Sequence, residues 1–134
     1  MANDITVSYV GQQAQGTESI VIRNFLSQDR PRGFQDNNSI DFAATGSVFL
    51  LGPSYRNKYI WTVNALMDTS EADTLETLYE NWDADRGAGF SAAVSVVDDT
   101  TTTTKTTSAI FSTAPSLSKR GPVYWEVAFG LTEV

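Results

Sequence analysis

The sequence predicts a mainly β (α+β) fold, an antiparallel β-sandwich or open barrel with one flanking α-helix at about residues 70–85. Most segments are short and either alternate apolar with polar residues or are largely apolar, as is typical of strands. Turn signals rather than helices separate most of them, which favours antiparallel pairing. Only one segment has helical periodicity. At 134 residues, the chain is expected to form a single domain over residues 1–134.

The centre of the predicted fold is a strand at residues 59–67 that leads into the helix. Alternate residues of this strand, from Tyr59 to Met67, share one apolar face. The helix has an apolar stripe at 3.6-residue spacing, made of Ala72, Leu75, Leu78, Tyr79 and Trp82. Either Asp68 with Glu71 or Ser70 with Asp73 would cap its start, and Gly87 and Gly89 would end it.

The remaining strands are expected on both sides of this centre, at residues 5–10, 19–25, 39–42, 47–51, 90–97, 106–111 and 123–131. Polar loops are expected at residues 11–18 and 114–122. Residues 27–38, which include Arg30, Pro31, Arg32 and Gly33, are expected to form a long exposed loop. Loops of this length are usually functional or become ordered when a partner binds.

Composition and charge limit the function classes. The chain has no cysteine or histidine, so disulfides, thiolate chemistry and the commonest general base are not available. No apolar run is long enough for a membrane span, and the first residues lack the features of a secretory signal. Of the 16 acidic residues, seven lie between residues 59 and 85, where there is no Lys or Arg. The other nine balance the nine basic residues, so the net charge of −7 belongs to the helix region and disfavours nucleic-acid binding.

No combination of residues predicts catalysis. No recognisable motif surrounds Lys58, Lys105 or Lys119 that would pair one of them with a nucleophilic serine. The carboxylate pairs at 83/85 and 98/99 are expected at a helix end and in a turn, where acids are usually solvated or capping. One such pair offers too few oxygens for calcium. We therefore expect a protein that is not an enzyme and that has no cofactor or metal.

The large aromatic residues are expected to be part of the core and not of a ligand site. They fall on the apolar faces of predicted elements, which pack inward. The residues in question are Trp61, Tyr79, Trp82, Trp125 and Phe129.

An acidic stripe runs along the predicted helix beside its apolar stripe. Asp73, Glu76, Glu80 and Asp83 are spaced so that they lie on one face, where like charges repel. Glu80 and Asp83 also lie toward the C-terminal end, where the helix dipole disfavours them. The stripe is either a solvated face that maintains solubility, or a surface that meets a basic partner or lines a polar channel.

Part of the chain resembles the minor tail and tail-tip (distal tail, baseplate hub) proteins of long-tailed bacteriophages. The resemblance covers about residues 55–134 and rests on the aromatic strand at 59–63, the acid-rich helix at 71–82, Gly89-Phe90 and the ending at 124–134. It implies a β-barrel or sandwich with a flanking helix that assembles into a ring at the end of the tail tube, with no catalytic residues. Whether the ring is tube, distal ring, hub or connector stays open.

The expected function is that of a structural virion protein, a subunit of a tail-tip or baseplate ring. It would assemble with itself, as a hexamer or trimer, and contact other tail proteins in a virion tail that is assembled in the host cytoplasm. No membrane and no specific nucleic-acid binding are expected, although DNA would pass through the ring. The interface residues of this hypothesis are Arg30, Arg32, Arg56, Asp73, Glu76, Glu80 and Asp83. The alternative is a small carbohydrate-binding β-sandwich, which exposed and coplanar Trp61 and Trp125 would favour.

Overall fold

The computed structural model describes residues 4–26, 32–35, 39–42, 46–51 and 58–134. Its main element is an eight-stranded antiparallel sheet with the order β2-β1-β8-β9-β10-β7-β3, in which β4 also pairs with β7. The strands of this sheet are β1 (Ile5–Val10), β2 (Thr17–Ile22), β3 (Asn24–Phe25), β4 (Arg32–Gln35), β7 (Lys58–Asp68), β8 (Val94–Asp98), β9 (Lys105–Lys119) and β10 (Tyr124–Glu133). The remaining two strands, β5 (Ser39–Phe42) and β6 (Val48–Leu51), form a separate two-stranded sheet.

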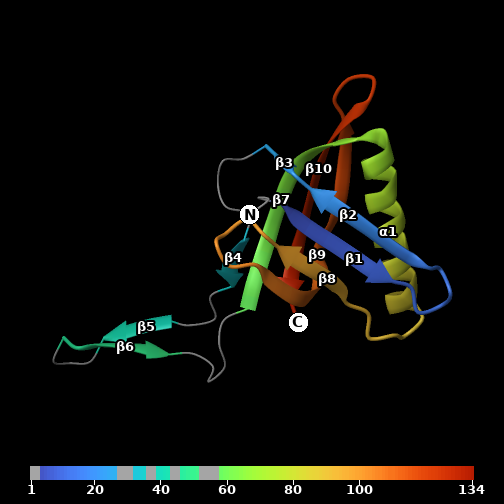
Figure 1. The fold of residues 1–134 in the computed structure, drawn as a ribbon. Coiled ribbons are helices and arrows are strands. Elements are labelled where there is room, and N and C mark those ends of the chain that lie inside the picture. The colour runs from blue at the N-terminus through green and yellow to red at the C-terminus, as the bar shows by residue number, and fades with distance from the viewer. Residues whose placement is uncertain (1–3, 27–31, 36–38, 43–45, 52–57) are drawn as a thin grey trace.

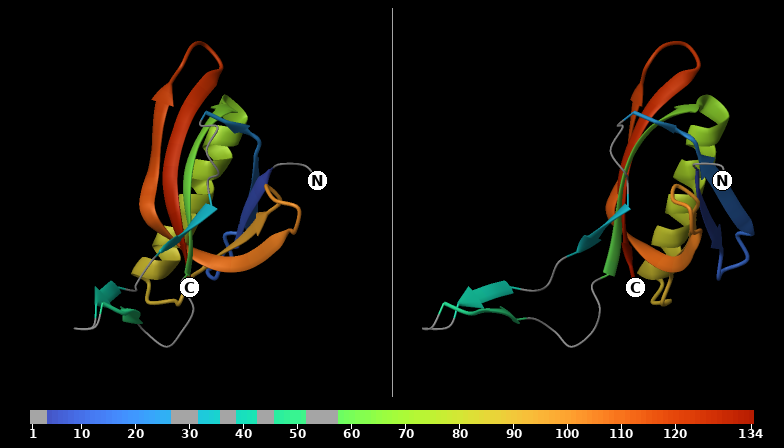
Figure 2. Two further views of the ribbon diagram at one scale, coloured as in Figure 1. Left: turned by 90° about the vertical axis from the view of Figure 1, so that its left-hand side faces the viewer. Right: turned by 60° about the vertical axis from the view of Figure 1, so that its left-hand side comes forward.

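The sheet curls into a half-barrel, and the helix α1 (Thr69–Gly87) lies against its open side (Figures 1 and 2). This arrangement confirms the predicted mainly β class with one flanking helix, in its open-barrel form. Inward-facing residues of the sheet and the apolar stripe of α1 meet in one core. The half-barrel therefore needs the helix to bury its concave face.

Local sequence explains the central strand and helix. In β7 the buried residues alternate with exposed or half-buried ones, as the period-two pattern predicts. Asp68 accepts a hydrogen bond from the Glu71 backbone N–H at 2.8 Å, and Glu71 accepts one from the Asp68 N–H, so the first of the two possible capping boxes forms. Gly89 adopts a φ of 93° just after the helix, a conformation that favours glycine.

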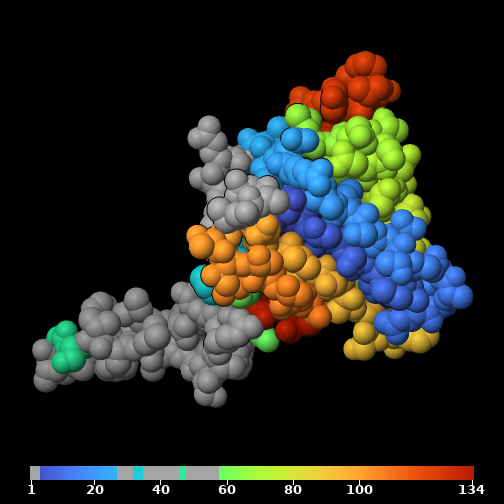
Figure 3. All heavy atoms as spheres, viewed as in Figure 1, coloured from blue at the N-terminus to red at the C-terminus, as the bar shows by residue number. Residues whose placement is uncertain are grey.

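Several element boundaries differ from the prediction. The segment 19–25 divides at Arg23 into β2 and β3, and the strand expected at 90–97 begins only at Val94. The loop expected at 114–122 is wrong over most of its length, because β9 continues to Lys119 in a ladder with β10. Breaker residues such as Pro115 do not end this strand, since proline is tolerated on an edge. The tip of the resulting β9–β10 hairpin rises beyond the N-terminal start of α1 (Figure 3).

The long loop expected at 27–38 is also wrong in part. Residues 32–35 form β4, whose register places Arg32 opposite Trp61 and Phe34 opposite Tyr59. The rings of Phe34 and Tyr59 lie 5.0 Å apart, which helps hold this strand on β7. Loop-forming residues surround the short segment β4 in the sequence, and pairing with β7 is what stabilises it as a strand. Residues 27–31 and 36–38 lie outside the described part of the chain.

Candidate functional site

The strands β5 and β6 form a hairpin that we call the arm, defined as Ser39–Phe42 and Val48–Leu51. Strands were predicted at both places, and the two pair with each other in antiparallel register. No other described strand pairs with them, and the arm stands clear of the half-barrel in every view (Figures 1 and 2). An isolated two-stranded hairpin is marginally stable in water, and no third strand or helix among the described residues supports the arm.

The register divides the arm into two unequal faces. Ile40 is opposite Leu50 and Phe42 is opposite Val48, and residues that are opposite each other share a face. All four residues on this face are apolar. The other face carries Ser39 and Asp41 besides its two apolar residues. An all-apolar face on a hairpin that stands clear of its own core is the pattern of a surface that another chain covers.

The strand that precedes the arm is anchored by a buried ion pair. Arg32 in β4 lies with its Nη1 atom 3.2 Å from the Oδ2 atom of Asp98, and the two side chains are only 2% and 0% exposed. Arg32 Nη2 also donates a hydrogen bond to Thr101 Oγ1 at 3.0 Å. Asp98 accepts further hydrogen bonds from the Trp61 indole at 3.0 Å and from the Thr100 backbone N–H at 2.9 Å. The ion pair thus ties β4, β7 and β8 together where the chain leaves for the arm.

The Arg32–Asp98 contact is an ion pair without good hydrogen-bond geometry. The Nε and Nη1 atoms of Arg32 are buried but have no hydrogen-bond partner, although Nη1 is close to the carboxylate. The pair is therefore better explained as a device that positions β4 than as a large source of stability.

The interface hypothesis for the basic residues needs correction. Arg32 was expected to be exposed in a loop and to contact another chain, but it is buried against its own chain. The sequence Arg-Pro-Arg-Gly is typical of a loop, and no nearby residue indicates that Arg32 pairs with the distant Asp98. Arg30 and Arg56 lie outside the described residues.

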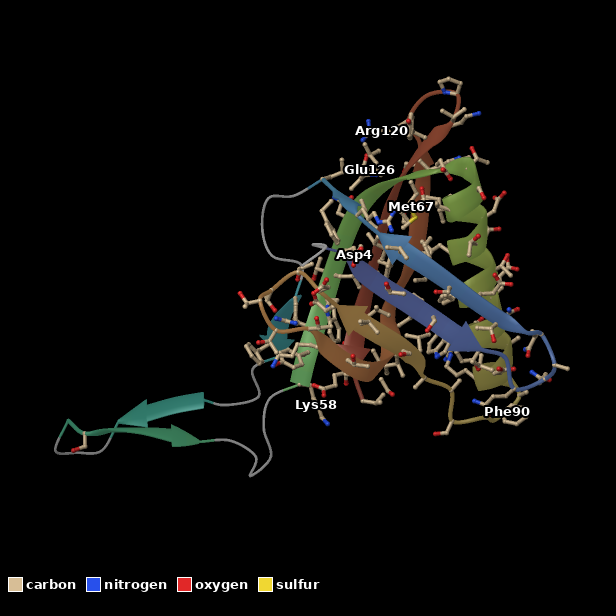
Figure 4. The ribbon with its side chains drawn as sticks, in the orientation of Figure 1. Asp4, Lys58, Met67, Phe90, Arg120 and Glu126 are labelled. Carbon is tan, nitrogen blue, oxygen red and sulfur yellow. The ribbon has the colours of Figure 1, made fainter. Side chains whose placement is uncertain are left out.

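The acidic stripe has the predicted exposure. Asp73, Glu76 and Glu80 are exposed on the outward side of α1, where oxygen-tipped side chains line the helix (Figure 4). They have no ion-pair partner within the described part of the chain. Asp83 differs, because it is half-buried and pairs with Arg86 one turn later. The unpaired part of the stripe is therefore Asp73, Glu76 and Glu80.

A second buried carboxylate, Asp85, was not anticipated as a site. It accepts hydrogen bonds from the Tyr9 hydroxyl, the Gln12 backbone N–H at 2.8 Å, Gln13 Nε2 at 2.8 Å and Gln15 Nε2 at 2.7 Å. Burial alone would raise the pKa of Asp85, but these donors outweigh it and hold the pKa well below its ordinary value. Burial, followed by the interaction with Asp85, raises the pKa of Tyr9 to about 12. The network fastens the β1–β2 turn to the end of α1.

The sequence contained a signal for this site. Asp85 follows Trp82 by three residues and therefore continues the apolar stripe of the helix. An acid in that position faces the core and needs buried donors, which the glutamine-rich turn at residues 12–15 supplies. The prediction treated Asp85 as a solvated helix-end acid, which is wrong, because its exposure is 0%.

The aromatic residues lie largely where the sequence predicted them. Trp61, Trp82 and Phe129 are buried, and Tyr79 and Trp125 are half-buried. Because Trp61 is only 1% exposed, it cannot form with Trp125 the exposed pair that would stack on a sugar.

Two other kinds of feature are absent from the described ranges. No group of three or more His, Cys, Asp or Glu residues there could hold a metal ion. No helix in the same ranges is long and apolar enough to span a membrane.

Comparison of the chain with protein-family models and with curated proteins finds no match.

Proposed function

We propose that this chain is a structural subunit of a bacteriophage tail, a component of a tail-tip or baseplate ring that assembles with copies of itself. In this proposal three or six copies form a ring in the virion tail, contact other tail proteins and let DNA pass without binding it specifically. Assembly takes place in the host cytoplasm. The observation that carries the proposal is the arm, whose apolar face stands clear of its own half-barrel.

The arm supports self-assembly on physical grounds. A hairpin this short is marginal alone, and burial of apolar surface at an interface contributes about 25 cal/mol per Å². A neighbour that covers the face would stabilise both the arm and the assembly. Interfaces between subunits that are always assembled are typically apolar in this way.

The tail assignment rests on the resemblance over residues 55–134. The elements that carry it, β7, α1 and β10, lie together, since β10 pairs with β7 along most of its length and α1 follows β7 directly. The buried ion pair fixes β4, the described strand that precedes the arm, and a closed ring requires subunits held in a fixed orientation.

The test is the size and shape of the purified protein. Analytical ultracentrifugation and negative-stain electron microscopy of the wild type should show rings of one diameter. Phe42→Ser/Leu50→Ser removes two side chains from the all-apolar face and should shift the protein to folded monomers with an unchanged far-UV circular dichroism spectrum. Phe49→Ser/Leu51→Ser changes the same residue types on the other face and should disturb assembly less.

A wild type that remains monomeric at concentrations well above micromolar would overturn the proposal. So would rings that both arm variants form as readily as the wild type. Mass spectrometry of purified virions tests the tail assignment separately, and a ring-forming protein that no tail contains would refute that part alone.

A further inference from the structure

The outer face of the main sheet contains a groove that the described residues of the chain leave open. It has a volume of about 490 Å³ and runs across three adjacent strands. It is lined by residues 60–64 of β7, 112–114 and 116 of β9, and 128–132 of β10. This face lies on the side of the half-barrel away from α1, and it faces the reader in the left-hand view of Figure 2.

Small side chains and a local irregularity create the hollow. Gly130 has no side chain, and its neighbours along the outer face, Ala128 on β10 and Ala114 on β9, are nearly as small. The β9–β10 register shifts on both sides of Gly130, which marks a β-bulge. A Cβ atom at Gly130 would lie 3.1 Å from Ser112 Oγ and from Thr113 Oγ1, so the side chains of these two residues pack next to the glycine. The hollow is thus built into the backbone.

The groove has the composition of an interface rather than of a solvated sheet face. None of its lining residues is charged, although the chain has 16 acidic and nine basic residues. The charged residues of this face lie beyond the two ends of the groove, with Lys58 at one end of β7 and the Arg120–Glu126 pair toward the β9–β10 tip (Figure 4). Depletion of charge is the compositional mark of the centre of a protein interface.

We propose that this groove receives the arm of a second copy of the chain, an inference that rests on the proposed self-assembly. The arm offers one all-apolar face, and its one charged residue, Asp41, belongs to the opposite face. An uncharged groove and an uncharged face fit each other without burying an unpaired charge. The arm stands clear of the groove of its own chain, so the occupant comes from a neighbour.

The dimensions agree with this pairing. Each arm strand has four residues, which corresponds to a length of about 13 Å, and two paired strands are about 5 Å apart. The groove crosses three strands, a floor about 10 Å wide between the outer strand axes. The arm would lie on this floor as one sheet packs on another.

Strand addition at a sheet edge is the competing arrangement. The open edge of β2 carries Glu18, and β9 beyond Ala109 pairs only with β10 but carries Pro115 and Lys119. Charges and proline are the usual protection of edges against such pairing. Edge pairing also leaves the apolar face of the arm uncovered, so the groove is the better receptor.

The absence of native cysteine allows a direct test by cross-linking. A size-tagged Phe42→Cys variant is mixed with untagged Ala128→Cys under mild oxidation. A disulfide needs Cβ atoms about 4 Å apart, so the product between unlike copies reports contact of arm and groove. Two matched controls replace the groove partner by Glu76→Cys on the exposed side of α1, or by Ser19→Cys on the edge of β2. We expect at least about tenfold more product with the groove, because contact raises the effective concentration toward millimolar.

Equal or smaller yields at the groove than at Glu76→Cys would overturn the inference, and a higher yield at Ser19→Cys would assign the arm to the sheet edge. Ala128→Glu provides an independent readout, since it places a charge in the groove at an exposed position. It should abolish rings while leaving the thermal midpoint of the monomer unchanged. If Phe42→Ser/Leu50→Ser breaks the wild-type rings but Ala128→Glu does not, the groove is not the receptor of the arm. The proposed self-assembly through the arm would then still hold. If the wild type is monomeric, the proposed function fails as well.

Discussion

The buried pair of Arg32 and Asp98 allows a quantitative test of how the base of the arm is held. Removing one partner of a buried ion pair leaves an unpaired charge and costs about 3–5 kcal/mol, whereas replacing both by apolar residues of similar volume is often neutral. After Arg32→Met, the carboxylate keeps its hydrogen bonds from Trp61 and Thr100, so we expect a loss near the lower limit, about 3 kcal/mol. Asp98→Ala leaves the guanidinium and the Trp61 indole without their acceptor, so we expect about 5 kcal/mol.

The double variant Arg32→Met/Asp98→Leu completes the cycle. Because Arg32 Nε and Nη1 make no hydrogen bonds, the double variant should recover the cost of the unpaired charge. The Trp61 indole still lacks its acceptor, so the stability should remain about 1–3 kcal/mol below that of the wild type. Urea unfolding followed by tryptophan fluorescence measures all four proteins, provided that the slopes agree. Additive losses in the double variant, or a larger loss for Arg32→Met than for Asp98→Ala, would refute this description of the pair.

Three further predictions concern the helix. Trp82→Ala should create a cavity that costs about 3–5 kcal/mol and lowers the Tm by on the order of 10 °C, and an unchanged Tm would mean that this side chain is not core. The depressed pKa of Asp85 adds stability that is present above its unfolded pKa of about 3.9 and is lost as the pH falls through the folded value. The deficit of Asp85→Asn relative to the wild type, measured by chemical unfolding, should therefore shrink below about pH 4, and a constant deficit would contradict the network with Tyr9. If the acidic stripe faces basic residues of a neighbour, rings should loosen as the Debye length falls from about 10 Å to 3 Å between 0.1 and 1 M salt, and Glu76→Gln/Glu80→Gln should remove this dependence. Sedimentation that shows tighter wild-type rings at high salt would indicate a stripe that lines the lumen.

The parts of the fold that the sequence predicts are those that depend on near neighbours. The alternation in β7, the stripe of α1 and the Asp68–Glu71 capping box are all set within a few residues, and all are found. The strands of the arm were predicted for the same reason. Their separation from the main sheet was not, because an alternating or apolar pattern identifies a strand but not the strand beside it.

The two buried carboxylates show where local patterns stop being informative. Both Asp85 and Asp98 are 0% exposed, and each depends on partners that are distant in the sequence. Acids are usually exposed, so a prior based on residue type assigns both to the surface. The helical position of Asp85 could have corrected that prior, whereas Asp98 lies at a strand end that gives no such signal.

The sheet order has a consequence for the time at which the protein can fold. β10 lies between β9 and β7, so these two strands cannot belong to one sheet until Tyr124–Glu133 have been synthesised. The arm, in contrast, needs only residues 39–51, which leave the ribosome long before. Pairing between distant segments is slow, and a nascent chain with exposed apolar surface is prone to aggregate. Both strands of the arm are therefore synthesised before the sheet that we propose as its receptor can be completed, so the half-barrel must form before ordered assembly can begin.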